Sequence, residues 1–201
     1  IYAPGMKNIS QLGYFGLHAL QHRGQESAGI AVNDGERIQY YKAAGLVQEV
    51  FTDEIIERLQ GDIAIGHVRY STTGDSYVVN AQPLVVQHKG GAIALAHNGN
   101  LINAQEIREQ LQDQGVIFQT SIDSEVIANL MARYSTTMSA EEAIQTVTGQ
   151  IQGSYAFVIT LGKKLIGVRD PYGLKPLCIG KLKEGYVISS ESCAFQVLDA
   201  E

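Results

Sequence analysis

Two runs of the chain, residues 92–96 (AIALA) and 154–161 (SYAFVITL), are apolar at nearly every position. A strand with one face in water alternates apolar and polar residues, whereas a strand buried on both faces is apolar almost throughout. These runs therefore predict strands that are covered on both sides. A chain of 201 residues can provide that cover by stacking sheets between layers of helices.

Most of the predicted strands are joined by short turns. Hairpins are expected over 27–45, turning at Asp34-Gly35, and over 84–99, turning at Lys89-Gly90-Gly91. Four strands linked by glycine-containing turns follow between 154 and 192. Helical spacing and cap residues predict helices within 9–24, 52–61, 103–115, 123–134 and 139–151. Hairpins with helices inserted in groups indicate antiparallel sheet and an α+β fold.

The segment AIALAHNGNL, residues 92–101, places Asn98-Gly99 between apolar residues, which is a strong hairpin signal. No returning strand follows. Instead Asn103 and Glu106 have the spacing of a helix cap. Asn98-Gly99 is therefore predicted to join a strand to a helix.

Charge and cysteine content narrow the classes of partner. The net charge is −6 without a basic run, so nucleic acid and anionic membranes are poor candidates. No apolar stretch approaches the ~20 residues of a membrane span. Cys178 and Cys193 are read as reduced, non-catalytic thiols of a cytoplasmic protein. Both ends of the sequence suggest a domain excised from a longer chain.

Polar stretches at strand ends and helix starts are the candidate sites. Arg69 could grip a carboxylate with its guanidinium fork, helped by the hydroxyls of Ser71, Thr72 and Thr73. It could equally pair with a surface acid. Asp123 could cap the following helix or accept a substrate ammonium. Together, Arg69 and Asp123 would hold both ends of an α-amino acid.

Asn98 and Gly99 could direct a side-chain amide and a backbone N–H at one point, which is how an oxyanion hole is built. A plain Asn-Gly turn is the alternative. Arg23, at the end of the first helix, could merely bond the last carbonyl groups. The histidines at 22, 67 and 97 lack recognisable metal-ligand spacing, so no metal site is expected.

The order of six motifs is more specific than any one of them. They are QHRGQESAGIAV, GHVRYSTTG, LAHNGNLINA, DSEVIANL, RDPYGLKPL and SSESCA. Together they resemble the class II glutamine amidotransferases, a family of N-terminal-nucleophile hydrolases. QHRGQ and RDPYGLKPL favour the glutaminase domains of amidophosphoribosyltransferases over those of enzymes that make glucosamine-6-phosphate, glutamate or asparagine.

The resemblance covers residues 1–201 and implies a four-layer αββα sandwich of two antiparallel sheets between helices. It assigns Arg69 to the glutamine α-carboxylate, where the hydroxyl of Thr72 is also expected, and Asp123 to the α-ammonium. Asn98 and Gly99 match the oxyanion hole, and Arg23 matches an arginine near the nucleophile.

In that family the nucleophile is the thiol of an N-terminal cysteine, and the free α-amine of the same residue acts as the general base. Ile1 aligns about five residues after it, so the nucleophile is not in this chain. The amine of Ile1 would lie about 15 Å from that position along an extended strand. The chain taken alone is therefore expected to be inactive.

The implied function is hydrolysis of glutamine to glutamate and ammonia. The ammonia would convert phosphoribosyl pyrophosphate to phosphoribosylamine, in purine synthesis, on a downstream phosphoribosyltransferase domain outside this chain. No cofactor is expected here; Mg²⁺ and any iron–sulfur cluster would belong to the absent region. The full protein is expected to be a homo-oligomer. A non-catalytic glutamine-binding domain, and the glutaminase domain of another class II enzyme, are the alternatives.

Overall fold

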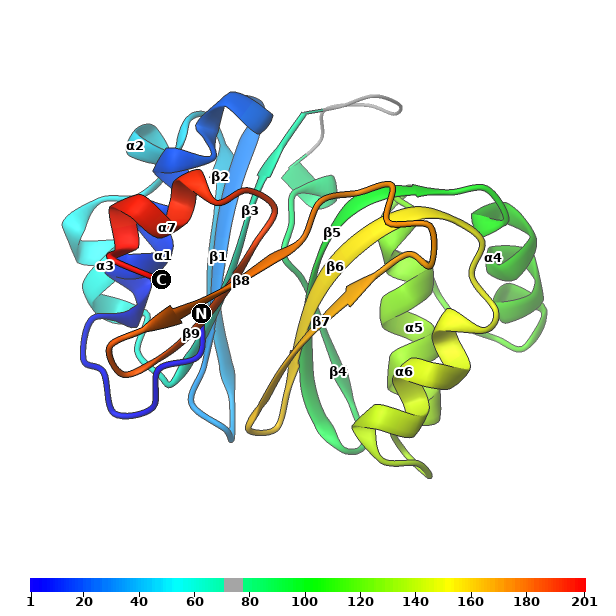
Figure 1. Cartoon of the computed structure of the whole chain (residues 1–201). Coiled ribbons are helices and arrows are strands. Elements are labelled where there is room, and N and C mark those ends of the chain that lie inside the picture. Colours follow the sequence, from blue (N-terminus) through cyan, green and yellow to red (C-terminus); the bar gives the residue numbers. More distant parts are fainter. Residues whose placement is uncertain (71–77) are drawn as a thin grey trace.

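A computed structural model describes residues 1–70 and 78–201. Two antiparallel sheets face each other at the centre, and helices cover the outer face of each (Figure 1). The predicted α+β fold, with its four αββα layers, is confirmed. Ser71, Thr72 and Thr73 lie outside the described residues.

The first sheet is built from two hairpins. One hairpin and a third strand pair in the order β2-β1-β3, and β8 and β9 form the other hairpin. The bounds are β1 Ser27–Asn33, β2 Ile38–Ala44, β3 Ile63–Arg69, β8 Cys178–Leu182 and β9 Gly185–Ser189. Asp34-Gly35 makes the predicted turn between β1 and β2.

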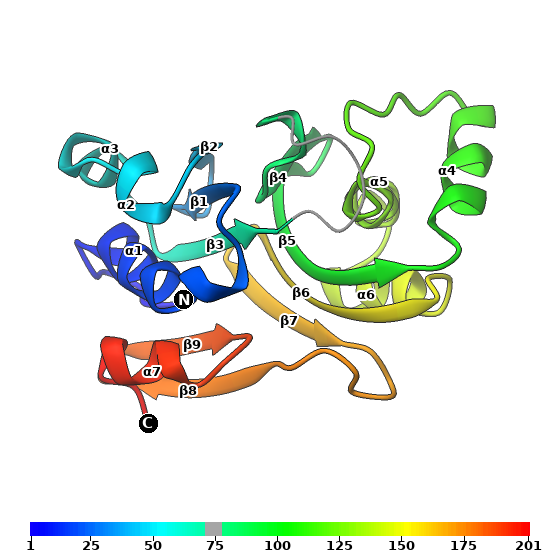
Figure 2. The same cartoon turned by 90° about the horizontal axis from the view of Figure 1, so that it is seen from above.

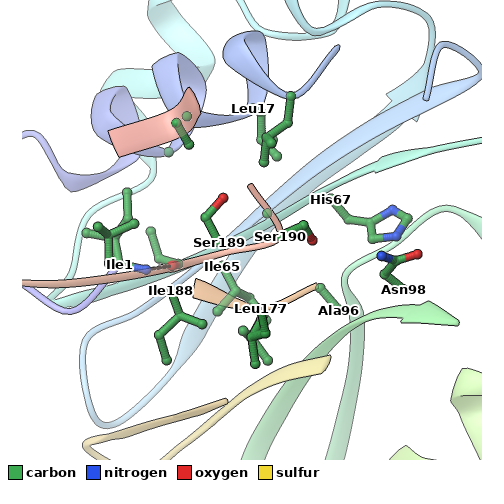
Figure 3. Close-up of a pocket in the computed structure, with 18 of the residues that line it drawn as sticks. Ile1, Leu17, Ile65, His67, Ala96, Asn98, Leu177, Ile188, Ser189 and Ser190 are labelled. Carbon is green, nitrogen blue, oxygen red and sulfur yellow. Dashed lines mark hydrogen bonds between the residues drawn. The ribbon is translucent and has the colours of Figure 1, made fainter. Parts of the chain in front are cut away.

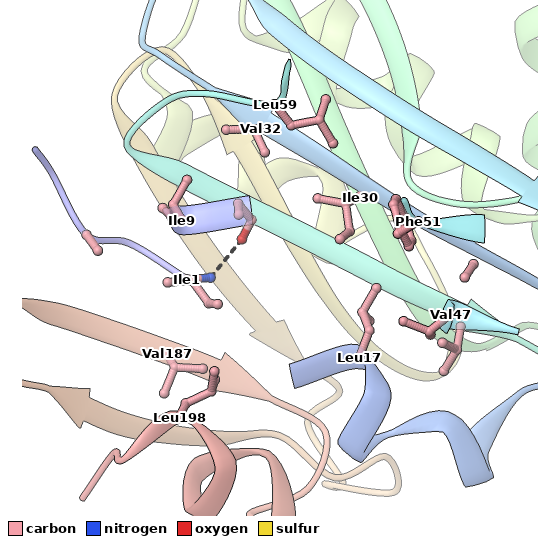
Figure 4. Close-up of a cluster of buried hydrophobic side chains, with 14 of the residues drawn as sticks. Ile1, Ile9, Leu17, Ile30, Val32, Val47, Phe51, Leu59, Val187 and Leu198 are labelled. Atoms are coloured by element: carbon pink, nitrogen blue, oxygen red, sulfur yellow. Dashed lines mark hydrogen bonds between the residues drawn. The ribbon is translucent and has the colours of Figure 1, made fainter. Parts of the chain in front are cut away.

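The first residues of the chain join these two parts. Tyr2 bridges Ile63 on β3 and Tyr186 on β9, both antiparallel. The Ile1 amine donates a 2.8 Å hydrogen bond to the carbonyl of Ala64, and the Ala64 amide donates to the Ile1 carbonyl at 2.9 Å (Figure 4). The opening segment is therefore a short strand that runs antiparallel to β3.

The second sheet has the order β4-β5-β6-β7. Its strands are β4 Leu84–His88, β5 Gly91–Leu101, β6 Gly153–Leu161 and β7 Lys164–Arg169. Strand β5 pairs with β4 only as far as Leu95, which lies opposite Leu84, whereas it pairs with β6 from Ile93 to Leu101. Beyond Leu95, the edge of β5 that faces away from β6 has no neighbouring strand among the described residues.

Helices are divided between the two outer faces (Figure 2). The first sheet carries α1 Ile9–Ala19, α2 Val47–Val50, α3 Asp53–Arg58 and α7 Cys193–Leu198, and the second carries α4 Ala104–Asp113, α5 Ser124–Tyr134 and α6 Ala140–Thr148. Two 3-10 turns, η1 Gln21–Arg23 and η2 Val78–Asn80, complete the assignment. Among the described residues, no helix is long and apolar enough to cross a membrane.

Three apolar clusters hold the layers together. Ile30, Leu17 and Val187 belong to the cluster under α1 and α7 (Figure 4). A second cluster lies under α5 and α6, and a small one of Ala31, Ile65, Ala94 and Ala96 lies between the sheets. The two apolar runs lie on β5 and β6, where residues 93–97, 155–157, 159 and 160 are buried, as the prediction of strands covered on both sides requires.

One local prediction is wrong. Asn98 and Gly99 do not form a corner; they lie inside β5 and pair with Ala156 and Tyr155. The Asn103 side chain does not cap α4 either, because it donates to the carbonyl of Gln150 and accepts from the amide of Gln152. The other predicted capping box, between Ser139 and Glu142 at the start of α6, does form.

Candidate functional site

A cavity of about 810 Å³ opens where the ends of β3 and β5 meet the start of α5. Concave sites with convergent polar groups are the usual ligand sites of proteins. The structure brings five predicted site residues to this one cavity: Arg23, Arg69, Asn98, Gly99 and Asp123. The sixth, Thr72, lies outside the described residues.

Arg69 is the last residue of β3 and its side chain is almost fully buried. Its Nη1 lies 3.5 Å from Oε2 of Glu26, and this is a long ion pair. Arg69 thus pairs with a partly exposed acid, as the alternative reading expected, although its own side chain is buried. The guanidinium also lines the cavity, where its remaining N–H donors can bind a carboxylate in a bidentate manner.

Asp123 immediately precedes α5 but makes no side-chain cap there. Its Oδ2 accepts a 2.9 Å hydrogen bond from the backbone amide of Leu101, at the end of β5. Burial raises the pKa of Asp123, but the His97 ring, whose Nδ1 lies 3.6 Å from Oδ1, and the backbone amides of Leu101 and Ser124 outweigh it, so the net pKa is below its ordinary value. An ionised carboxylate is therefore held at the cavity, ready to receive a cation.

The side chains of His97 and Ser124 hold the Asp123 carboxylate in place. The Ser124 hydroxyl lies 2.9 Å from Nδ1 of His97 and 3.4 Å from Oδ1 of Asp123. Both side chains are buried. The backbone of His97 is itself held by Gln82, whose Oε1 accepts from the His97 amide at 2.7 Å. This network restricts the acid to one orientation.

The backbone N–H of Gly99 points to the free edge of β5. The amides two residues away on either side, at His97 and Leu101, donate to side chains on that edge, and backbone N–H groups alternate in direction along a strand. Tyr155, opposite Gly99 on β6, accepts from Asp170 on the other side. The Gly99 amide therefore lies between Gln82 and Asp123, facing the cavity.

A side chain at position 99 has no room. A Cβ there would lie 2.2 Å from the carbonyl oxygen of Ser154 and 2.7 Å from Nε2 of His97. Glycine is therefore required by close approach of the neighbouring strand.

Asn98 supplies a second donor beside this amide. Its Nδ2 is buried and has no hydrogen-bond partner among the described residues. Buried donors without partners are uncommon in native proteins and call for an explanation. Because Asn98 also lines the cavity, this amide can donate to a ligand oxygen.

Arg23, in η1, also lines the cavity. Its Nη1 donates to Oε1 of Glu191, which comes from the loop between β9 and α7. Arg23 is thus held by a side-chain partner rather than by the carbonyl groups of the first helix. Cys193 has its Sγ 3.8 Å from Oε2 of the same Glu191.

A narrower cavity of about 110 Å³ adjoins the first and shares His67, Asn98 and Ser190 with it. It lies between β3 and the segment 187–190, and Figure 3 shows Ile1 on one side and His67 and Asn98 on the other. Its lining is mostly apolar. We call it the slot, since it continues the path of the opening strand past Ile1.

His67 is partly buried beside the slot, and burial lowers its pKa to about 4. Its Nε2 lies 3.0 Å from the carbonyl oxygen of His97, so the neutral ring carries its proton on Nε2. His67 thereby ties β3 to β5 at the junction of the two cavities.

The sequence motifs did not reveal the residues that shape the loop before Asp123. The buried Glu125 accepts from the amides of Gln119 and Thr120, both at 2.8 Å. Arg108 donates to the carbonyls of Thr120 and Ile122 at 3.0 and 2.8 Å. The only signal was a carboxylate directly after Asp-Ser, within DSEVIANL.

Comparison with known families places these residues in a described domain. A family model described as "Glutamine amidotransferase domain" matches residues 67–197. That range is more than half of the chain and contains Arg69, Asn98, Gly99 and Asp123.

Two curated relatives named amidophosphoribosyltransferase match nearly the whole chain. The protein of Methanocaldococcus jannaschii is 51% identical over 202 residues, which is 100% of this chain and 43% of its own length. That of Bacillus subtilis is 46% identical over 197 residues, which is 98% of this chain and 41% of its own length. The chain thus spans about two fifths of these relatives.

Two solved structures have the same fold. The glutamine phosphoribosylpyrophosphate amidotransferase of B. subtilis, complexed with ADP and GMP, has a TM-score of 0.88 and 44% identity. A structure described as the allosteric regulatory enzyme of purine biosynthesis has a TM-score of 0.92 and 45% identity. Each alignment covers 98% of this chain and 42% of the other.

Proposed function

Because the chain belongs to the glutamine amidotransferase domain family, we propose that its 810 Å³ cavity binds glutamine and hydrolyses the side-chain amide. The observation that carries this proposal is the convergence of a guanidinium, a carboxylate and two amide donors on one cavity. Arg69 and Asp123 would hold the α-carboxylate and α-ammonium. These groups are far apart along the chain, so their proximity is a result of the fold and not of neighbouring positions in the sequence.

The remaining donors would act on the reacting amide. When a nucleophile attacks the side-chain carbonyl, negative charge develops on its oxygen. The Asn98 Nδ2 and the Gly99 N–H would stabilise that charge, and losing one such donor typically slows a reaction ~100- to 1,000-fold. Ammonia leaves, and water then releases glutamate from the covalent intermediate.

The proposed nucleophile is a cysteine that precedes Ile1 in the whole protein. Support comes from the register of the opening strand, in which Ile1 pairs with Ala64 on β3. In an antiparallel pair, each step back along one strand is a step forward along the other. A residue about five positions before Ile1 would therefore lie opposite Arg69, at the cavity, after passing along the slot. Its own amine would serve as the general base.

For the whole protein we propose amidophosphoribosyltransferase activity. Ammonia released here would pass to a phosphoribosyltransferase domain and convert phosphoribosyl pyrophosphate to phosphoribosylamine, in purine synthesis. The relatives' names and their greater length support this. Mg²⁺ and any iron–sulfur cluster would serve that other region, whereas glutamine hydrolysis itself needs no cofactor. Two unpaired cysteines fit a reducing cytoplasm, and we expect a homo-oligomer.

The test compares three proteins: the chain beginning at Ile1, the same chain extended at its start to the cysteine, and the extended chain with that cysteine replaced by alanine. Ammonia and glutamate are measured after glutamine is added. We expect equal amounts of the two products from the cysteine form and none from the others. Turnover by the chain that begins at Ile1 would contradict the proposed nucleophile. Glutamine binding without turnover in the cysteine form would favour a non-catalytic binding domain.

A further inference from the structure

Three side chains with metal-binding atoms meet beside Arg23, and none of them lines the cavity. They are His22 in η1, Glu191 in the loop after β9, and Cys193 at the start of α7. Nε2 of His22 lies 2.9 Å from Oε2 of Glu191, and Sγ of Cys193 lies 3.8 Å from the same oxygen. All three ligand atoms lie within 4.8 Å of one another.

This combination of donors is chemically selective. Imidazole nitrogen, carboxylate oxygen and thiolate sulfur together suit zinc and similar divalent ions, whereas Mg²⁺ and Ca²⁺ take oxygen ligands. With metal–ligand bonds of about 2.0 to 2.3 Å, ligand atoms of a tetrahedral site lie roughly 3.3 to 3.8 Å apart. The observed distances of 2.9 and 3.8 Å lie around that range, so small side-chain rotations suffice.

The three ligands are held by elements that pack on one another. Helix α7 lies against α1, which leads directly into η1 (Figure 1). The Arg23 guanidinium holds the other oxygen of the Glu191 carboxylate, Oε1. Outer partners of this kind orient a metal ligand and raise the affinity of its site. Oε2 is thereby directed toward His22 and Cys193.

We propose that His22, Glu191 and Cys193 form a binding site for a zinc-class divalent ion, with a fourth position open to water. Binding involves no redox change. The Cys193 thiol loses its proton to solvent, and Nε2 of His22 offers its lone pair while any ring proton resides on Nδ1. The site adjoins the cavity through Arg23, which Glu191 contacts directly.

The competing explanation is a surface ion-pair cluster in which Glu191 only holds Arg23 and His22. Cys193 would then have no part, although its sulfur lies between Oε2 of Glu191 and the carbonyl of Ala19, at 3.8 and 3.7 Å. The two explanations differ in one measurable respect: whether the thiolate of Cys193 coordinates the ion.

The experiment titrates Co²⁺ into the metal-free chain beginning at Ile1, which has only two cysteines. Co²⁺ is a spectroscopic substitute for Zn²⁺, and a thiolate ligand gives a sulfur-to-cobalt charge-transfer band. We expect that band in the original chain and not in Cys193→Ser. In competition with a chromophoric chelator, Cys193→Ser and His22→Gln should each weaken Zn²⁺ binding at least ~10-fold, as loss of even an outer partner does.

Matched controls come from the same chain. Cys178→Ser removes the other thiol, and His18→Gln removes another exposed histidine of the same helical region. Both should leave the band and the Zn²⁺ affinity unchanged. His22 is exposed, so its variant should remain folded by circular dichroism. Absence of the band in the original chain, or its persistence in Cys193→Ser, would overturn the site.

Discussion

The carboxylate of Asp123 accepts a hydrogen bond from the backbone amide of Leu101 across 2.9 Å. The acid at the start of α5 is thus fixed to the end of β5 instead of capping its own helix. Because Gly99 lies two residues before Leu101 on the same edge, this bond also sets the distance between the proposed ammonium site and the proposed oxyanion hole.

Asp123→Asn should weaken glutamine binding. The substitution keeps the shape and an acceptor for the Leu101 amide but removes the charge that would meet the ammonium. Charge-assisted hydrogen bonds contribute about 1.5 to 3 kcal/mol, so affinity should fall ~10- to 100-fold. Calorimetric titration with glutamine measures this.

Asp113→Asn, at the exposed end of α4, is the matched control. Since the pKa of Asp123 lies below its ordinary value of 3.8, affinity should also persist on acidification until that range is reached. Equal affinity in Asp123→Asn and the original chain would contradict the proposed clamp.

Arg69→Lys should also reduce glutamine affinity, although the positive charge is kept. Lysine cannot present the two parallel N–H donors of a guanidinium to a carboxylate. The loss of one charge-assisted bond predicts ~10-fold weaker binding or more. Arg37→Lys serves as the control, because the Arg37 side chain is exposed and pairs with Asp34. If glutamine binds Arg69→Lys as tightly as the original chain, the α-carboxylate lies elsewhere.

Structural features that depend on contacts between neighbouring residues could be predicted from the sequence. The Asp34-Gly35 hairpin and the Ser139–Glu142 capping box depend on contacts within a few residues, and both form as expected. Asn98-Gly99 has the same local signal as a turn, yet it continues a strand. Pairing with β6 through Leu101 outweighs the local preference, and that partner lies some fifty residues further along the chain.

Features made by distant segments could not be read from the motifs. Asp123 was expected to cap a helix or bind a ligand, and its bond to Leu101 depends on how α5 meets β5. The meeting of His22 with Glu191 joins residues 169 positions apart. The resemblance to a family identified the candidate site residues, whereas the residues that hold them in place could be identified only from the folded structure.

Asn98→Ala should slow glutamine hydrolysis without lowering stability. Nδ2 of Asn98 is buried and has no hydrogen-bond partner among the described residues, so its removal should leave the free energy of unfolding unchanged or raise it. If Nδ2 stabilises the developing oxyanion, kcat should fall ~100- to 1,000-fold while glutamine affinity changes little.

The measurement uses the cysteine-extended chain, with kcat from ammonia release and stability from urea unfolding. Asn129→Ala is the matched control, because Nδ2 of Asn129 is also buried without a partner among the described residues but does not line the cavity. A large loss of stability in Asn98→Ala, or an unchanged kcat, would remove Asn98 from the proposed oxyanion hole.

His67 should make the fold sensitive to mild acid. Its pKa is about 4 in the folded chain and near 6.5 when solvated. Between these values the unfolded chain binds a proton that the folded chain does not, so stability falls as the pH falls. A shift of this size predicts a loss of roughly 2 to 3 kcal/mol between about pH 7 and pH 4.5.

The Asp123 carboxylate does not share this window, because its lowered pKa places its own effect below 3.8. His67→Gln keeps a donor for the His97 carbonyl but cannot titrate. The difference in urea-unfolding free energy between the two pH values should therefore shrink by most of that amount, whatever the variant's stability at neutral pH. His88→Gln, at the end of β4 beside the β4–β5 turn, should shrink it less. An identical pH dependence in His67→Gln and the original chain would mean that His67 is not held neutral by burial.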